Sequence, residues 1–336
     1  MQKKKLGKTN LDVSVIGFGG IPVQRISHEE AKLVVRAAVD KGLNFFDTAR
    51  NYTDSEEKIG SALKGLRHKI VIATKALGRD KDTMEKEIEL SLKNFQTDYI
   101  DLYQFHNVKT EQDLEKILGP GGALEALVQA KEQGKIRYIG ITGHVEKTLI
   151  KALDAFEFST VQFPRNYIED TAEKELFPLA RKKNMGIIIM KPLAGGAFSN
   201  TNLALRYLLG QDYSTVIPGM DTIEQINANL DLGINFIPLS KEEVIKLEQE
   251  AQELGPKFCR RCEYCKPCPQ GLDITEFFII HTYFKRYGLK DRIITRYNNM
   301  SIMADQCIEC GICETKCPYE LPIKKMLKEI HADLKI

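Results

Sequence analysis

The sequence predicts an α/β protein: a (β/α)8 TIM barrel followed by a small, mostly helical C-terminal domain that binds metal. Short β-rich apolar runs alternate with amphipathic stretches over roughly the first 250 residues. Gly255-Pro256 then interrupts the pattern, and all eight cysteines of the 336-residue chain lie between Cys259 and Cys317. Because periodicity alone does not close a barrel, a doubly wound parallel sheet is the alternative.

Eight runs have the length and composition of buried strands. In chain order they are VSVIGF (13–18), NFFDTA (44–49), IVIATK (70–75), YIDLYQFH (99–106), IRYIGIT (136–142), TVQFP (160–164), GIIIMKP (186–192) and STVIPG (214–219). Ahead of the first strand, KKKLGKTNLDV (3–13) predicts a hairpin with its turn near Lys8-Thr9-Asn10, which we expect to cap the barrel bottom.

Helix-like stretches with apolar residues at three- and four-residue intervals separate these strands. Examples are residues 27–42, 82–96, 122–135 and 171–184. One more amphipathic helix covers 239–254, so we place the domain boundary there: residues 1–254 form the barrel and residues 255–336 the second domain. The second domain should contain helices near 273–288 and 321–334, joined by a connecting segment.

The charge balance argues for small-molecule chemistry. Forty-eight basic and 46 acidic residues give a formal net charge of +2, which creates no strong field for nucleic acid or an anionic membrane. The N-terminus lacks an apolar run of secretory length, and no segment approaches the roughly 20 apolar residues of a bilayer span. We expect a cytoplasmic protein.

Three successive predicted strands end in a titratable residue. Asp47 ends the second strand, Lys75 the third and His106 the fourth, while Tyr52 follows Asp47 in the loop. Catalytic groups of TIM barrels lie at these strand ends. Each residue alone is more often structural than catalytic, but together they suit one proton transfer, because a nearby ammonium favours a phenolate. His106 would orient a carbonyl oxygen beside the phenol.

The segments FFDTARNYTDSEEKIG, IATK and DLYQFHN resemble the aldo/keto reductase family over about residues 3–254. The resemblance implies an NAD(P)H-dependent carbonyl reductase or alcohol dehydrogenase. It assigns Tyr52 as the general acid in reduction, Lys75 and Asp47 as the residues that tune it, and His106 as the residue that places the carbonyl.

The resemblance also implies cofactor contacts, with departures from the family pattern. The implied positions are Thr142, Gln162, Met190, Gly219, Gln225 and Asn229. The family's Ser-Asn pair is Thr142-Gly143 here, and Met190 replaces its stacking aromatic residue. Residues 217–229 contain no Lys or Arg to meet a 2′-phosphate, so NADH and NADPH both stay open.

Two glycine clusters complete the candidate cofactor site. GFGGIP (17–22), which includes Gly19, departs from a dinucleotide fingerprint at Pro22 and predicts a tight turn at the barrel mouth. AGG (194–196), centred on Gly195, would bring backbone amides to a pyrophosphate, although a plain turn is the alternative.

The second domain carries two cysteine runs. Cys307, Cys310, Cys313 and Cys317 before Pro318 reproduce the bacterial ferredoxin spacing, whose fourth cysteine ligates the other cluster. Cys259, Cys262, Cys265 and Cys268 form a second run with a shorter last spacing. We therefore group Cys317 with the first three cysteines of the earlier run, and Cys268 with the first three of the later run. Paired C-x2-C elements also build zinc sites, which is the alternative.

This region resembles the ferredoxin-like dicluster 4Fe-4S tails of a subset of aldo/keto reductases. Nicotinamide transfers a hydride whereas a cluster transfers one electron, so direct exchange needs an intermediary such as a flavin, and no segment indicates a flavin site. The clusters serve an external ferredoxin-like or other redox partner, or they are structural or regulatory. The alternatives to a carbonyl reductase are an electron-transfer protein whose barrel docks a partner or flavin, and a redox-sensing binding protein without turnover.

Overall fold

The computed structural model describes residues 1–261 and 263–335, in two compact units. The barrel unit comprises Met1–Leu193 and Thr201–Leu239, and the second unit comprises Ala194–Asn200 and Ser240–Ile336. Helix α10 (Lys241–Leu254) thus packs within the second unit, whereas the sequence placed it with the barrel. The domain boundary after residue 254 stays a prediction.

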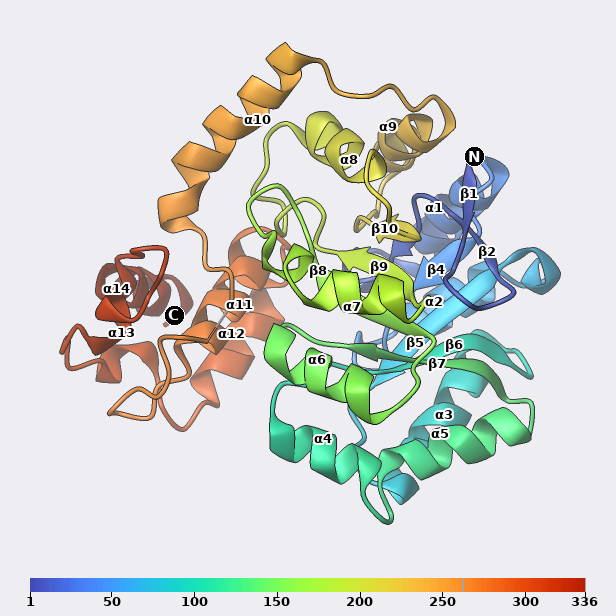
Figure 1. Ribbon diagram of the computed structural model, residues 1–336, viewed down its shortest axis with the longest axis horizontal. Helices are drawn as coiled ribbons and strands as arrows, with labels where there is room; N and C mark the ends of the chain where they lie inside the picture. Colours follow the sequence, from blue (N-terminus) through green and yellow to red (C-terminus); the bar gives the residue numbers. More distant parts are fainter. Residues whose placement is uncertain (262, 336) are drawn as a thin grey trace. The chain divides into compact units, whose positions relative to one another are not determined.

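Eight parallel strands form the barrel in sequential order (Figure 1). They are β3 (Phe18–Gly19), β4 (Phe45–Asp47), β5 (Val71–Ala76), β6 (Ile100–Phe105), β7 (Ile136–Thr142), β8 (Thr160–Pro164), β9 (Gly186–Met190) and β10 (Thr215–Ile217). Parallel bridges between Ile16 and Val216 and between Gly19 and Gly219 join the first strand to the last. The predicted barrel is confirmed, and the doubly wound alternative is wrong because its strand order is not sequential.

The first predicted strand, 13–18, needs correction. Its beginning belongs to an antiparallel hairpin of β1 (Lys3–Lys5) and β2 (Asp12–Ser14), and only Phe18–Gly19 enters the barrel sheet. Leu6 and Val13 of this hairpin are buried in one cluster with Val71, near the start of a barrel strand. The hairpin therefore caps the barrel bottom, as expected.

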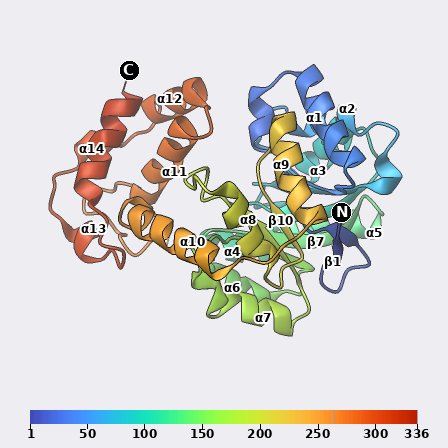
Figure 2. The same cartoon turned by 90° about the horizontal axis from the view of Figure 1, so that it is seen from above.

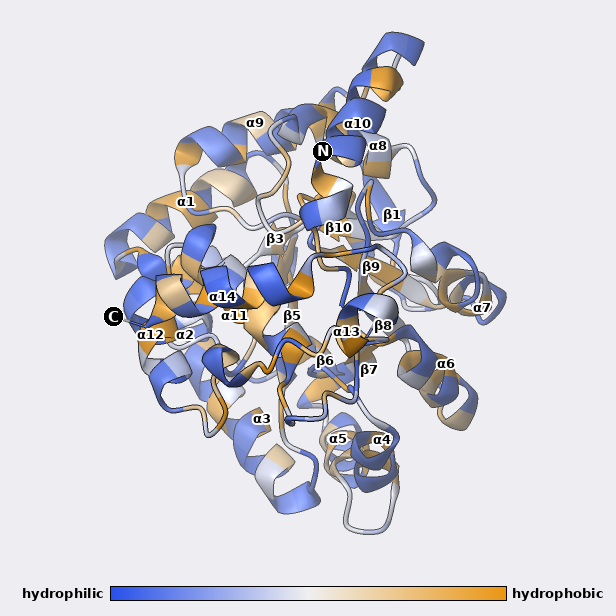
Figure 3. Ribbon diagram, turned by 90° about the vertical axis from the view of Figure 1, so that its left-hand side faces the viewer, coloured by the Kyte–Doolittle hydropathy of each residue, from blue (hydrophilic) through white to orange (hydrophobic). Residues whose placement is uncertain are grey.

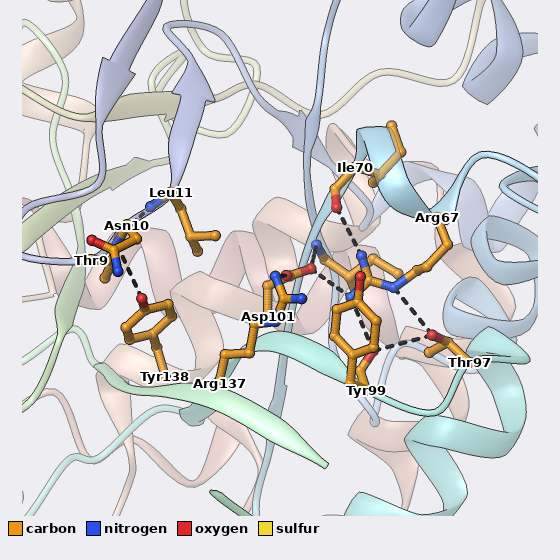
Figure 4. A network of polar contacts seen from close by, with 11 residues as sticks. Thr9, Asn10, Leu11, Arg67, Ile70, Thr97, Tyr99, Asp101, Arg137 and Tyr138 are labelled. Atoms are coloured by element: carbon orange, nitrogen blue, oxygen red, sulfur yellow. Dashed lines mark hydrogen bonds and ion pairs between the residues drawn. The ribbon is translucent and has the colours of Figure 1, made fainter. Parts of the chain in front are cut away.

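A network of charged side chains ties the strand starts together at the same end (Figure 4). The buried carboxylate of Asp101 pairs with Arg67 at 2.6 Å and with Arg137 at 3.0 Å. Both guanidinium groups also lie over the ring of Tyr99, 3.8 and 4.2 Å from its centroid. The N-terminal end of a barrel serves stability, so we assign this network a structural role.

Nine α-helices of the described chain surround these strands. They are α1 (His28–Asp40), α2 (Ser55–Ala62), α3 (Lys81–Phe95), α4 (Glu111–Leu118), α5 (Ala123–Glu132), α6 (Glu146–Ala155), α7 (Leu176–Lys182), α8 (Thr201–Leu209) and α9 (Ile223–Ile234). Helices such as α5 and α6 carry both hydrophilic and hydrophobic residues (Figure 3), as expected where one face covers a core. The helix predicted at 171–184 is divided into a 3-10 turn, Thr171–Glu173, and α7.

The second unit is helical. Besides α10 it contains α11 (Ile274–Lys285), α12 (Lys290–Asn298), α13 (Ile312–Thr315) and α14 (Ile323–Leu334), and α11, α12 and α14 pack together (Figure 2). Helix α12 lies in the predicted connecting segment, where Leu289, Ile293 and Tyr297 repeat every fourth residue and join the core. In the part of the chain that is described, no helix is long and apolar enough to cross a membrane.

Candidate functional site

The structure brings the four candidate catalytic residues together at the C-terminal ends of neighbouring strands. Asp47 is the last residue of β4, Lys75 lies at the end of β5 and His106 directly follows β6. All three are at least nine-tenths buried, while Tyr52 is half-buried in the loop after β4. The sheet register places Lys75 beside Gln104, so the strand ends meet at one rim.

Lys75 and Asp47 form a buried ion pair. The Nζ atom of Lys75 donates hydrogen bonds to Oδ1 of Asp47 at 2.5 Å and to the carbonyl oxygen of Thr48 at 2.8 Å. Burial lowers the pKa of Lys75, and the neighbouring carboxylate of Asp47 opposes this by favouring the charged form. The carboxylate of Asp47 and the carbonyl of Thr48 therefore fix the orientation of the Lys75 ammonium.

Tyr52 lies near both the ammonium of Lys75 and the imidazole of His106. Its ring centroid is 5.4 Å from Nζ of Lys75, and 5.7 Å from the ring centroid of His106, with the two rings nearly perpendicular. A phenol beside a fixed cation and an imidazole is suited to release a proton toward an oxygen bound between them.

The loop that carries Tyr52 is anchored at Arg50. The backbone N–H of Arg50 donates to the carbonyl of Lys75 at 2.9 Å, and its Nη1 donates to Glu56 at 2.7 Å. Glu56 is fully buried and also accepts from the hydroxyl of Thr74. Sequence reasoning missed this anchor, although Arg50 and Glu56 flank Tyr52 in the quoted motif.

His106 is neutral at neutral pH. Burial, followed by the charges of Lys75 and Arg79, lowers its pKa well below the ordinary value. Its Nδ1 atom is buried without a hydrogen-bond partner among the described residues. A neutral imidazole that is not already fully bonded can donate to a carbonyl oxygen without bringing a second cation beside Lys75.

Two glutamines complete the surroundings of Asp47. Nε2 of Gln104 donates to Oδ2 of Asp47 at 3.1 Å, and Nε2 of Gln162 lies 3.4 Å from Oδ1. The Oε1 atoms of both glutamines are buried and lack a partner in the described chain, so these acceptors fit the amide group of a nicotinamide. Gln104 was missed, although it precedes His106 by two residues and therefore shares its face of the strand.

The other predicted cofactor positions are dispersed among several elements. Thr142 ends β7, and its hydroxyl accepts from the backbone N–H of Asn107 at 2.9 Å. Met190 ends β9 and is half-buried, and Asn229 is buried in α9. Gly19 and Gly219 form the bridge that closes the barrel, Gln225 accepts from the N–H of Asp221 at 2.8 Å, and Gly195 lies in the second unit.

An unforeseen cation stands beside the 217–229 segment. Arg25, from the 3-10 turn Pro22–Arg25, forms an ion pair through Nε with Oδ2 of Asp221. Asp221 is buried, and its Oδ1 atom has no partner within the described residues. The 217–229 segment lacks Lys and Arg, so the sequence of this segment does not indicate the cation. The bridge between Gly19 and Gly219 brings the loop of Arg25 beside the loop of Asp221.

Four cysteines from the two runs line one hollow in the second unit. Cys268 lies there with Cys307, Cys310 and Cys313, together with Leu272 and Ile274 among the apolar neighbours. Burial, followed by the nearby Glu314 and Cys307, raises the pKa of Cys313 to about 11, so a metal that binds this sulfur would have to displace the thiol proton. A hollow with four sulfur ligands and apolar walls fits an iron–sulfur cluster.

Three further cysteines pack against the hydrophobic core of the second unit, to which α11, α12 and α14 contribute. Cys259, Cys265 and Cys317 contact this core, and Sγ of Cys259 accepts from the backbone N–H of Arg261 at 3.4 Å. Hydrogen bonds from backbone N–H groups to sulfur are typical of iron–sulfur clusters. Cys262 lies outside the described residues. Within residues 1–261 and 263–335, no three His, Cys, Asp or Glu side chains form a site for a single metal ion.

Comparison with known proteins matches two separate parts of the chain to two families. A model of the aldo/keto reductase family matches residues 15–203, and a model of a 4Fe-4S dicluster domain matches residues 258–322. L-galactose dehydrogenase of Arabidopsis thaliana is 30% identical over 304 residues, which are 73% of this chain and 94% of that protein. The uncharacterized oxidoreductase YqkF of Bacillus subtilis is 27% identical over 310 residues, 75% of this chain and 97% of its own.

Solved structures extend the likeness to the fold. The holo form of aldo-keto reductase AKR11C1 from Bacillus halodurans superimposes with a TM-score of 0.65 at 27% identity, covering 76% of this chain and 96% of that one. An aldo-keto reductase from Klebsiella pneumoniae in complex with NADPH has a TM-score of 0.64 at 24% identity, covering 74% and 95%, and supports the fold alone. With its sequential barrel and the family model matched over residues 15–203, this chain belongs to the aldo/keto reductase family and carries a C-terminal 4Fe-4S dicluster domain.

Proposed function

We propose that the barrel reduces an aldehyde or ketone with NAD(P)H, and oxidises the alcohol in reverse. The observation that carries the proposal is the meeting of Tyr52, Lys75 and His106 around the buried carboxylate of Asp47. The substrate class beyond a small carbonyl compound is open. Because one relative is named for L-galactose, aldoses belong in a substrate panel.

In this proposal the bound cofactor supplies a hydride from its nicotinamide ring to the carbonyl carbon. Tyr52 donates its hydroxyl proton to the carbonyl oxygen as the C=O π bond breaks, which leaves an alcohol and a phenolate. The ammonium of Lys75 stabilises that phenolate, and Asp47 keeps the ammonium in place. His106 donates a hydrogen bond to the same oxygen and orients it, and solvent returns the proton to Tyr52.

The cofactor would lie along the rim. Gln162 and Gln104 offer buried amide oxygens to the carboxamide, and Met190 would pack against the nicotinamide ring. Gly19, Thr142, Gly195, Gly219, Gln225 and Asn229 are the further proposed contacts. Hydride transfer would take place in the cytoplasm, where we expect the protein to act.

The C-terminal unit would hold two 4Fe-4S clusters. We assign Cys268, Cys307, Cys310 and Cys313 to one cluster, supported by the hollow that they share, and Cys259, Cys262, Cys265 and Cys317 to the other. Such clusters supply one-electron chemistry when bound, which suits an external ferredoxin-like or other redox partner. This domain also supports the second candidate function, an electron-transfer protein whose barrel docks a partner or flavin.

Tyr52→Phe should reduce the rate of NAD(P)H-dependent carbonyl reduction by about 10²- to 10⁴-fold, because it removes the proton donor. Iron content should not change. Tyr138→Phe deletes the same atom at the barrel bottom, where the hydroxyl accepts from Asn10, and should leave the rate unchanged. Steady-state rates over a carbonyl panel measure both, and an unimpaired Tyr52→Phe enzyme would contradict the assigned mechanism.

NADPH should bind no more than about tenfold tighter than NADH, because Asp221 neutralises Arg25 and repels a 2′-phosphate. Asp221→Asn should release Arg25 and raise the preference for NADPH by about tenfold. Glu224→Gln, at an exposed acid of the same segment, is the matched control and should change little. Fluorescence titrations of the wild type and both variants give the dissociation constants for NADH and NADPH. A wild-type preference for NADPH of thousands-fold would refute this prediction.

Cys317→Ala should degrade the cluster of Cys259, Cys262 and Cys265 and spare its neighbour, whereas Cys268→Ala should do the reverse. The reason is that each run's last cysteine serves the other run's cluster. Iron analysis and electron paramagnetic resonance of the reduced, anaerobically prepared proteins distinguish the two lesions. If Cys317→Ala instead destroys the cluster of Cys307, Cys310 and Cys313, the assignment is wrong.

A further inference from the structure

A buried carboxylate lies beside barrel strand β5. It belongs to Glu56, in the first turn of α2, which is fully buried. Its partner on the strand is Thr74, whose hydroxyl donates to Oε1 of Glu56 at 2.7 Å. Thr74 directly precedes Lys75, and successive side chains of a strand point to opposite faces of the sheet. Glu56 therefore contacts one face of the strand whose other face carries the Lys75 ammonium.

Four donors surround the carboxylate of Glu56. Oε1 accepts from the hydroxyls of Thr74 and Ser91, the latter at 2.9 Å. Oε2 accepts from Nη1 of Arg50 at 2.7 Å and from Nδ2 of Asn94 at 3.0 Å. An ionised carboxyl group offers about four acceptor sites and no donor, so this set of donors suits the anion. All five residues belong to the barrel unit.

Arg50 connects this carboxylate to the loop of Tyr52. It precedes Tyr52 in that loop, and its backbone N–H donates to the carbonyl of Lys75 at 2.9 Å. The loop is also held after Tyr52, because the N–H of Ser55 donates to the carbonyl of Tyr52 at 2.9 Å. Ser55 is the first residue of α2 and directly precedes Glu56. Tyr52 thus lies between a side chain that Glu56 binds and the helix start that contains Glu56.

Glu56 is also a second negative charge for Lys75. Burial is the largest influence on the pKa of Lys75 and lowers it, and the adjacent carboxylate of Asp47 gives the strongest opposing effect. The charge of Glu56 acts in the same direction as Asp47 and raises this pKa. The charged and titratable groups that interact with Glu56 are Arg50, Lys75, Glu87 and Tyr103. Arg50 and Lys75 are the two cations of this group.

We propose that Glu56 is a positioning residue for carbonyl reduction. It fixes Arg50 and thereby the loop of Tyr52, and its charge helps to keep Lys75 protonated. The inference rests on the proposed function of the barrel. Glu56 acts through Arg50 and Lys75 and not by contact with the substrate. A purely structural Glu56 would affect stability alone, whereas a positioning Glu56 also sets the pH range in which Tyr52 and Lys75 keep their protons.

The test compares Glu56→Gln with Glu57→Gln in the full chain with reconstituted clusters. Glutamine keeps the shape of Glu56, and its NH2 group can donate to the hydroxyls of Thr74 and Ser91, which also accept, so the main loss is the charge. Glu57 is exposed in the same helical turn and matches that loss. The single-turnover rate of hydride transfer is measured against pH, with the carbonyl compound of the panel that the wild type reduces fastest.

Reduction requires a protonated Tyr52 and a charged Lys75, so the rate should fall at high pH. Without the Glu56 charge, the pKa of Lys75 is lower and the proton of Tyr52 is lost more readily, because a nearby anion favours the protonated form of both groups. In Glu56→Gln the fall should therefore begin at lower pH, by about half a pH unit or more, with unchanged iron content. Glu57→Gln should follow the wild-type profile.

A wild-type protein that reduces no carbonyl compound of the panel would refute the proposed function, and this inference with it. Wild-type reduction together with an equal pH profile in Glu56→Gln would overturn the inference alone. If Glu56→Gln does not fold, Arg50→Gln is measured instead, since it removes the cation that Glu56 binds. The fall should then move to higher pH, and an unmoved profile contradicts the proposal.

Discussion

The buried ion pair of Lys75 and Asp47 is the interaction on which the barrel site depends. Two charges removed from water are costly, and losing one partner of such a pair costs about 3–5 kcal/mol because the other charge is left uncompensated. The carbonyl of Thr48 and the amides of Gln104 and Gln162 surround the pair with further hydrogen bonds. Together with Lys75 and Asp47, these groups come from four strands or strand ends, those of β4, β5, β6 and β8, so the pair requires the closed rim.

The two halves of the chain differ in the chemistry that they support. The barrel rim brings together a phenol, a fixed ammonium and an imidazole, which would suit the proposed two-electron reduction of a carbonyl. The second unit offers a sulfur-lined hollow, which suits one-electron chemistry or a structural role. The segment Ala194–Asn200, which follows β9 in the chain, belongs to the second unit.

Sequence patterns predicted what depends on short-range periodicity. The sequence predicted that Asp47, Lys75 and His106 lie at strand ends, and the structure places them at the ends of β4, β5 and β6; the two-residue spacing from Gln104 to His106 also indicated Gln104. The ion pair of Arg25 and Asp221 joins residues 196 positions apart, so no local sequence pattern predicts it. Likewise, the AGG motif indicated a turn but not the unit to which it belongs, because Arg286, whose Nη1 donates to the carbonyl of Ala194, lies 92 positions further along the chain.

The most direct test of the account is to follow the transferred hydrogen. The full chain with its clusters would reduce a panel of aldehydes, ketones and aldoses with NADH and NADPH deuterated at either face of nicotinamide C4. The account predicts an alcohol with one deuterium on the former carbonyl carbon, from only one of the two labelled forms. Oxidation of the cofactor with electrons appearing in the clusters and no deuterium in any alcohol would contradict it.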